Sequence, residues 1–235
     1  VSLMMVNNET GAVNDIAAVA RMLKAENSIA LLHTDAVQGF LKVPFSAKTL
    51  GADMISVSGH KVHAPKGIGA LYVRQGLKLP AHILGGGQED GLRSGTEPMP
   101  QIAAFGEAVR IAKAEMPEAN KRMEALRAQC VQTLTDTVPD IVFLGGGSAH
   151  ILSLSLPGYR SEVLMNYLEA KGIYVSKSSA CKRGKRSHVL EAIGAPDKVI
   201  DGALRVSFSR YTTAEECAYF CEALAAARKE LYPSL

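Results

Sequence analysis

A lysine and an aspartate each stand where a short apolar run ends. Lys61 belongs to the polar stretch SGHK, which follows the apolar run 54–57. Asp35 lies in HTDAVQ, at the end of the run 29–33. A single lysine of this kind is usually a solvated charge, and an aspartate there usually caps the next segment. Their joint placement indicates more, because open α/β sheets gather polar groups where their strands end.

A lysine amine together with a carboxylate is what a pyridoxal phosphate site requires. The lysine forms a Schiff base near neutral pH only if burial or nearby positive charge favours its neutral form. The carboxylate holds a proton on the pyridine nitrogen, which keeps the ring an electron sink. Ser58 and His60 flank Lys61 with donors suited to a phosphate, and Gly-rich turns let backbone N–H groups approach one. The sequence therefore predicts pyridoxal 5'-phosphate as the cofactor.

A cysteine in a strongly basic stretch is a third candidate. Cys181 precedes Lys182, Arg183, Lys185, Arg186 and His188, with Gly184 between them. Positive charge favours the thiolate, which is the nucleophilic form, and glycine suits an exposed loop. The alternatives are a solvated loop or a basic patch that docks an acidic partner. Core packing is the simpler expectation for the cysteines in apolar helical patterns, which are Cys130, Cys217 and Cys221.

The first half of the chain alternates strands with a helix. The apolar patterns predict strands at 1–6, 29–33, 53–57 and 69–73 and a helix at 15–26. A strand–helix–strand unit implies a right-handed crossover and a parallel sheet. The predicted fold class is therefore α/β with a mainly parallel sheet.

From Met99 the pattern becomes helical, and we expect Pro117 to break or kink that helix near Met116. Beyond it, the patterns predict strands at 141–144, 151–156, 173–176 and 204–207, and helices at 161–171, 187–193 and 213–231. Fewer and shorter strands are typical of a smaller α+β layer. We therefore place one domain at 1–115 and a second at 116–235.

The composition fits a globular protein and excludes several classes of function. The chain has 47% hydrophobic and 21% charged residues. A net charge of +3 and an aromatic content of 6% offer neither a basic field nor a stacking platform for nucleic acid. No run approaches the roughly 18 apolar residues that cross a bilayer, and the four cysteines show no zinc spacing. With no charged leader before the first strand, we expect a cytoplasmic protein without nucleic-acid, membrane or metal partners.

Five ordered motifs resemble the cysteine desulfurases of the class-V aminotransferase superfamily: VNNETG, HTDAVQ, SGHKVHAPKGIGALYV, GGGQEDGLRSGTE and SSACKRGKRSHVLEAIG. The resemblance covers essentially the whole chain, and five ordered motifs are much more specific than any one of them. It implies fold type I of the pyridoxal phosphate-dependent enzymes, with a partial large domain and a smaller C-terminal domain. It also implies conversion of L-cysteine to L-alanine and sulfur supply to iron–sulfur cluster or thiolation pathways.

The resemblance assigns Lys61 to the covalent attachment of the cofactor and Asp35 to its pyridine nitrogen. The remaining cofactor contacts would come from Asn8 and Gln38 on the phenolic-oxygen side, and from Ser58 and His60 at the phosphate. Thr96 would reach the phosphate of a neighbouring subunit, which implies a homodimer.

For the substrate, the resemblance assigns Arg205 to the carboxylate of L-cysteine, with Asn8 nearby. A planar guanidinium binds a carboxylate through two hydrogen bonds, as a lysine does not. Cys181 would take the sulfur as a persulfide and pass it to an acceptor protein.

The resemblance also shows gaps. Family members carry, ahead of the VNNE strand, further phosphate contacts and a histidine that stacks on the cofactor ring. We therefore expect a C-terminal portion that lacks part of the cofactor domain and is inactive alone. Only seven residues separate Cys181 from VLEAIG, so the acceptor is not fixed by the resemblance. The rival hypotheses are a related lyase or aminotransferase, such as a selenocysteine lyase, and a catalytically silent partner subunit.

Overall fold

The structure, a computed structural model, describes residues 1–177 and 186–233. Contacts within the chain group it into two compact units. The first unit combines 1–6 with 14–116, and the second combines 7–13 with 117–235. The segment 7–13 thus packs with the second unit. The domain limits 1–115 and 116–235 stay a prediction for the protein as a whole.

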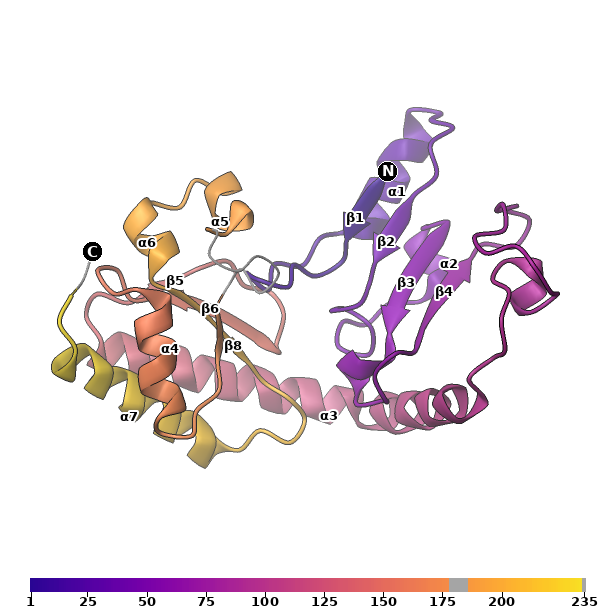
Figure 1. Cartoon of the computed structure of the whole chain (residues 1–235). Helices are drawn as coiled ribbons and strands as arrows, with labels where there is room; N and C mark the ends of the chain where they lie inside the picture. The colour runs from indigo at the N-terminus through magenta and orange to yellow at the C-terminus, as the bar shows by residue number, and fades with distance from the viewer. Residues whose placement is uncertain (178–185, 234–235) are drawn as a thin grey trace. The chain divides into compact units, whose positions relative to one another are not determined.

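The first unit is built on a four-stranded sheet with the order β1-β2-β3-β4 (Figure 1). The strands are β1 (Ser2–Met4), β2 (His33–Asp35), β3 (Met54–Ser58) and β4 (Gly69–Val73). The β1–β2 and β2–β3 pairs are parallel, and β3–β4 is antiparallel. The helices are α1 (Ile16–Ala25), α2 (Ala47–Leu50), and the 3-10 helices η1 (Gly59–Val62) and η2 (Glu89–Gly91). The predicted mainly parallel sheet is confirmed.

The strand predicted at 29–33 is wrong in position. β2 begins only at His33, and Ile29 is 99% exposed. The polar residues HTD form the strand instead because their backbones pair with both β1 and β3. Thr34 is fully buried between these neighbours, opposite Leu3 and Ile55. The polar end of the apolar run therefore occupies the centre of the sheet.

Helix α3 (Met99–Thr137) continues past Pro117, so the helix is not broken there, and the alternative of a kink stays a prediction. A proline inside a helix lacks one N–H, and the carbonyl that loses its donor is that of Lys113. Both residues are exposed, so water can bond that carbonyl. Although α3 has 39 residues, no helix in the described ranges is both long and apolar enough to cross a membrane.

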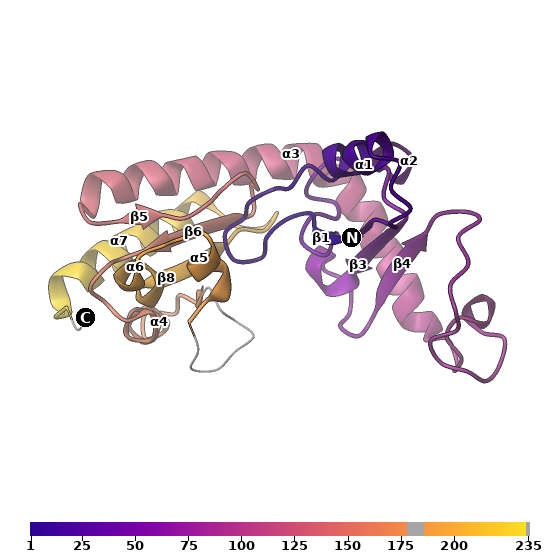
Figure 2. The same cartoon turned by 90° about the horizontal axis from the view of Figure 1, so that it is seen from above.

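The second unit is an α+β layer on an antiparallel sheet with the order β5-β6-β8-β7. Its strands are β5 (Val142–Phe143), β6 (Ile151–Ser155), β7 (Ser176–Lys177) and β8 (Ala203–Ser207). Its helices are α4 (Ser161–Glu169), α5 (His188–Ala192), α6 (Asp197–Asp201) and α7 (Ala214–Glu230). In both views α7 runs beside the second half of α3 (Figures 1 and 2). The strand predicted at 173–176 is displaced, since only Ser176 of that range is paired.

One large core holds the second unit together. It packs side chains of α3, α4 and α7 against the sheet, among them the fully buried Leu134, Leu154, Leu164 and Leu224. A smaller cluster lies under α5 and α6, around Leu190 and Ile200. The position of β8 is therefore fixed by packing on a continuous apolar layer.

Candidate active site

Lys61 lies on η1, directly after β3 ends at Ser58. Glycine makes this turn possible, because a Cβ on Gly59 would lie 2.8 Å from Ile68 Cγ2. The turn ends at His63, whose φ of 67° lies in the left-handed region and whose N–H donates to Gly59 O. A non-glycine residue with such a backbone marks a constrained turn. The half-buried Lys61 is thus carried on a closely defined backbone.

The two predicted phosphate contacts share this turn. Ser58 Oγ and His60 Nδ1 lie 2.7 Å apart. Ser58 is half-buried and His60 is exposed. A hydroxyl and an imidazole are both able to donate to a phosphate oxygen. The structure therefore brings Ser58 and His60 together beside Lys61.

Asp35 is the last residue of β2, the strand next to β3. The two strands are parallel, so their carboxyl ends meet at one edge of the sheet, with Asp35 paired to Ser56. Asp35 Oδ1 accepts the Val37 N–H at 2.9 Å, while the side chain stays exposed. Gln38 is half-buried in the following turn. Asp35 and Gln38 thus lie at the sheet edge from which the Lys61 turn begins.

Thr96 lies in a separate loop of the first unit, and its side chain is exposed. Ser94 Oγ donates to Gly86 O at 2.9 Å within this loop. A contact from Thr96 to a neighbouring subunit stays a prediction.

A second lysine at this turn was not among the predicted site residues. Lys42 Nζ donates to Lys61 O at 2.8 Å. Burial, and after it the charge of Lys61, lower the pKa of Lys42 to about 8. A signal was present in the sequence, since Lys42 is the single charge in the apolar stretch GFLKVPF. A lysine between large apolar side chains is seldom fully solvated.

In the second unit, the predicted substrate contacts Asn8 and Arg205 touch each other. Arg205 lies on β8, which has a paired strand on each side. Its Nη1 donates to Asn8 O at 2.9 Å and its Nη2 to Ser176 Oγ at 3.2 Å. Asn7 Oδ1 accepts the Glu9 N–H at 2.9 Å, which folds this segment into a tight turn. The guanidinium is therefore held at two points while remaining half-buried.

A buried carboxylate ties the same segment to α5. Glu9 is only 6% exposed and accepts a hydrogen bond from Ser187 Oγ, the side chain that caps α5. The neighbouring Arg186 pairs with Asp197 at 2.8 Å and Asp201 at 2.7 Å, and these hydrogen bonds raise its pKa. Glu9 was not among the predicted site residues, because its partner Ser187 is 178 positions away in the sequence.

Cys181 lies outside the described residues, so its role as sulfur acceptor stays a prediction. The other cysteines are buried, and Cys221 Sγ lies 4.0 Å from Cys130 O. Hydrogen bonding to Cys221, together with burial, raises the pKa of Cys130. Burial also raises the pKa of Cys217 to about 12. Cys130 and Cys217 therefore stay protonated near neutral pH, which makes them poor nucleophiles.

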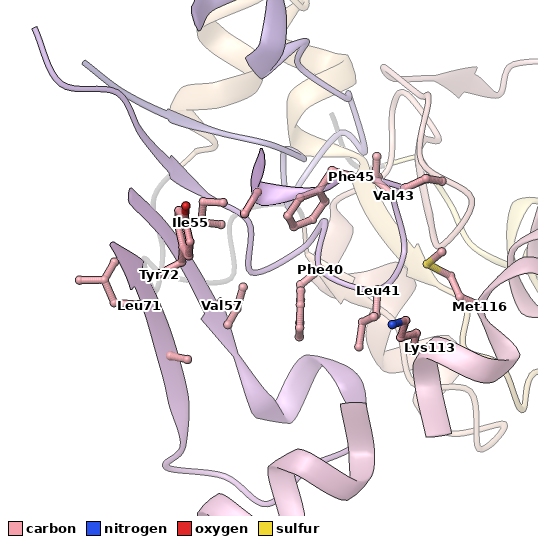
Figure 3. Close-up of a pocket in the computed structure, with 13 residues that line it drawn as sticks. Phe40, Leu41, Val43, Phe45, Ile55, Val57, Leu71, Tyr72, Lys113 and Met116 are labelled. Atoms are coloured by element: carbon pink, nitrogen blue, oxygen red, sulfur yellow. The ribbon is translucent and has the colours of Figure 1, made fainter. Parts of the chain in front are cut away.

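A pocket of about 460 Å³ lies in the first unit but contains none of the predicted site residues. Its lining is mainly apolar and includes Phe40, Phe45, Ile55, Leu71, Tyr72 and Met116 (Figure 3). A phosphorylated ligand needs convergent polar groups, which this lining lacks. The polar cluster at the Lys61 turn is therefore the better candidate for a cofactor site.

The chain matches the family model described as aminotransferase class-V over residues 1–220. It belongs to the class-V aminotransferase family. It is 41% identical over 221 residues to cysteine desulfurase 2 of Trichormus variabilis, covering 92% of this chain and 55% of that protein. It is 43% identical over 227 residues to cysteine desulfurase IscS of Tolumonas auensis, covering 93% and 55%. The chain thus spans about half the length of the curated relatives it matches.

Solved structures of this family share the fold. A NifS-like protein matches with a TM-score of 0.90 at 39% identity, covering 98% of this chain and 61% of that one. A NifS-like protein from Rickettsia africae matches with a TM-score of 0.88 at 28% identity, covering 97% and 61%. These matches confirm the predicted fold type and the resemblance on which it was based.

Class-V aminotransferases and cysteine desulfurases depend on pyridoxal phosphate. The described residues of the first unit fit this cofactor. Lys61 offers an amine, Asp35 an exposed carboxylate for the ring nitrogen, and Ser58 with His60 a pair of donors for the phosphate. Asp35 ends β2 and Ser58 ends β3, while His60 and Lys61 follow β3 directly, so all four lie at one edge of the sheet.

Proposed function

We propose that this protein is a cysteine desulfurase that converts L-cysteine to L-alanine and stores the sulfur as a persulfide on Cys181. One observation carries the proposal: Lys61 stands on a constrained turn at the sheet edge where the neighbouring strand ends in Asp35. The similarity to named cysteine desulfurases selects this reaction among those of the family. This activity is proposed for the whole protein, because the chain spans about half the length of the curated relatives it matches.

Pyridoxal phosphate, when bound, supplies an electron sink for negative charge that develops on the substrate. Lys61 would hold the cofactor through its amine and, when that amine is free, would move the proton removed from the substrate Cα. Asp35 would keep a proton on the pyridine nitrogen. Ser58 and His60 would bind the phosphate.

Arg205 orients the substrate by binding its carboxylate. Asn8 O and Ser176 Oγ hold the guanidinium at 2.9 Å and 3.2 Å, so it is positioned before the substrate arrives. A guanidinium held in advance loses less entropy when it binds a carboxylate.

The sulfur transfer is balanced without an external oxidant. The Cys181 thiolate attacks the sulfur of the substrate, an S–S bond forms and the Cβ–S bond breaks. The electron pair of the broken bond stays with Cβ. Cβ then takes up a proton, and the product leaves as alanine. The oxidation state of each sulfur atom rises by one, and the oxidation state of Cβ falls by two.

The test is mass spectrometry of the natural-length protein after exposure to L-cysteine. We expect Cys181 to gain the mass of one sulfur atom, and Cys181→Ser to keep the cofactor absorbance while losing at least about 100-fold in alanine formation. Lys61→Ala should lose covalent cofactor attachment. Cys130→Ser, at a buried thiol, is the matched control and should keep the sulfur transfer.

Three results would contradict the proposal. Persulfide formation by Cys181→Ser at the parent rate would reject Cys181 as the nucleophile. Turnover of selenocysteine that does not need Cys181 would favour a selenocysteine lyase. Cofactor binding without turnover of any amino acid would favour a silent partner subunit.

We extend the proposal to a cytoplasmic homodimer that passes sulfur to an acceptor protein. The exposed Thr96 loop supports the dimer, since its side chain is available to a second subunit. The basic stretch after Cys181 supports an acidic acceptor surface. Sedimentation of the natural-length protein measures the dimer, and a monomer would exclude it.

A further inference from the structure

We propose that Lys42 is a positioning residue for Lys61, which fixes the backbone of the reactive lysine and places a second positive charge at the same turn. The proposal rests on the proposed function, because it concerns the same site. Neither the family motifs nor the spacing of the predicted site residues assigns a role to Lys42.

A hydrogen bond joins the side chain of Lys42 to the backbone of Lys61. The carbonyl of Lys61 lies in the last turn of η1, where carbonyl groups have no partner within the helix. Lys42 Nζ donates to this carbonyl at 2.8 Å, from a position 19 residues earlier in the chain. A lysine that bonds a helix-end carbonyl both satisfies the acceptor and complements its partial charge. The hydrogen bond therefore sets where the Lys61 backbone lies.

The segment that carries Lys42 is itself closely defined. Leu41 has a φ of 55°, in the left-handed region that non-glycine residues seldom adopt. The N–H groups of Lys42 and Val43 both donate to Gly39 O, at 3.0 Å and 2.8 Å. Gly39 in turn lies against Met5, since a Cβ there would be 2.5 Å from the Met5 sulfur. A strained residue beside the lysine is maintained by these contacts, as is common near functional sites.

The positive charges of the two lysines also interact. The charge of Lys61 acts on Lys42, whose pKa burial and that charge lower to about 8. Repulsion between two positive charges is mutual, so the charge of Lys42 acts on Lys61 in turn. Because the pKa of Lys42 is near 8, the effect is present below pH 8 and fades above it. Cofactor attachment needs a neutral amine in this range.

Other titratable side chains lie on the elements packed around the two lysines. They are His60 and His63 on the turn of Lys61, Asp35 at the end of β2, and Lys113 on α3, which lines a pocket together with Leu41. Asp35 is the carboxylate in this group and attracts a proton, which opposes the effect of Lys42. The variants of Lys42 must therefore be compared with Asp35 left unchanged.

The first experiment follows the absorbance of the bound cofactor against pH in the natural-length protein. Lys42→Gln removes the charge, and we expect the midpoint of the absorbance change to rise by about one pH unit, which is about tenfold in proton affinity. Lys42→Arg keeps charge and donor, so its midpoint should stay within a few tenths of a unit of the parent. Equal midpoints for the parent and Lys42→Gln would overturn the proposal, and so would equal shifts for both variants.

The second experiment needs no cofactor and no turnover. Competitive acetylation of the cofactor-free protein, read peptide by peptide, gives the pH at which each lysine is half reactive. We expect Lys42 to be half reactive at a lower pH than the exposed Lys66. Lys61→Met should raise the pH of half reaction of Lys42 and leave that of Lys66 unchanged. No change at Lys42 would overturn the coupling. If this coupling is found while alanine formation is absent, the desulfurase assignment fails and the pairing of the two lysines stands.

Discussion

The two units of the chain bury their side chains to different extents. Among the twelve largest fully buried side chains in the described residues, ten lie in the second unit, and the first contributes Ile16 and Leu32. The first unit leaves Leu71 and Tyr72 of β4 50% and 39% exposed and contains the apolar pocket. Packing therefore defines the second unit more than the first.

The two units also hold their site residues by different means. Arg205 lies on a strand inside the large core of the second unit, and its guanidinium bonds to neighbouring groups. Lys61 lies on a turn that ends at the left-handed His63, and the half-buried ammonium of Lys42 bonds to its carbonyl. We infer that the loss of a buried apolar side chain destabilises the second unit more than the first.

The sharpest test of this contrast is a pair of leucines. Leu154 is fully buried in the core of the second unit, and Leu154→Ala should lower the free energy of unfolding of that unit by about 3–5 kcal/mol, through lost burial and a residual cavity. The control Leu71→Ala, on the half-exposed β4, should cost less than about 1 kcal/mol. Urea unfolding followed by circular dichroism measures both. Equal losses would remove the contrast.

Much of the fold was readable from the sequence because its strands and helices carry regular apolar patterns. β4 and α7 lie where the patterns predict them, within one residue at each end. The pattern failed at β2, because HTD holds polar residues at the centre of the sheet. It also did not predict that the helix would continue unbroken past Pro117, which the exposure of Lys113 allows.

The sequence predicted those site residues whose role follows from their residue type within a recognisable motif. Lys61, Asp35, Ser58 and His60 lie in such motifs, and the structure places them at one sheet edge. Lys42 and Glu9 were missed because each acts through a partner far along the chain. A hydrogen bond across 19 or 178 positions leaves no spacing signal in the sequence.

A second prediction concerns the guanidinium of the second unit. Arg205→Lys replaces a planar fork by an ammonium, which lacks the two parallel N–H groups that bind a carboxylate while others bond Asn8 O and Ser176 Oγ. In the natural-length protein we expect the KM for L-cysteine to rise about 10- to 100-fold, with a smaller change in kcat. Arg228→Lys, at an exposed pair with Asp140, should leave both unchanged. An unchanged KM for Arg205→Lys would separate Arg205 from substrate binding.

The buried carboxylate at the start of the second unit gives a third prediction. Glu9→Gln keeps the shape but loses the charge that strengthens the hydrogen bond from Ser187, so the free energy of unfolding should fall by about 1–2 kcal/mol. Ser187→Ala should cost a similar amount, because it also removes the cap of α5. In a double-mutant cycle the two losses should be less than additive, by about 1 kcal/mol. Strict additivity would mean that the two side chains act independently.

The smallest effect tests charge in the first unit. Burial alone would raise the pKa of Asp53, but hydrogen bonds from the Leu32 N–H at 2.8 Å and Arg74 Nε at 2.6 Å hold it below its usual value. A carboxyl group whose pKa is lower in the folded than in the unfolded protein stabilises the folded state. The contribution is complete at a pH above the pKa of the unfolded protein, which is near 3.8 for Asp53. It is lost as the pH falls through the lower pKa of the folded protein. Asp53→Asn should therefore cost about 1 kcal/mol at pH 7, and the difference from the parent should shrink below about pH 4. The exposed Asp90→Asn is the control for a general charge effect, and its stability should follow that of the parent in urea unfolding at each pH. A pH-independent loss for Asp53→Asn would assign the stabilisation to the shape of the side chain and not to its charge.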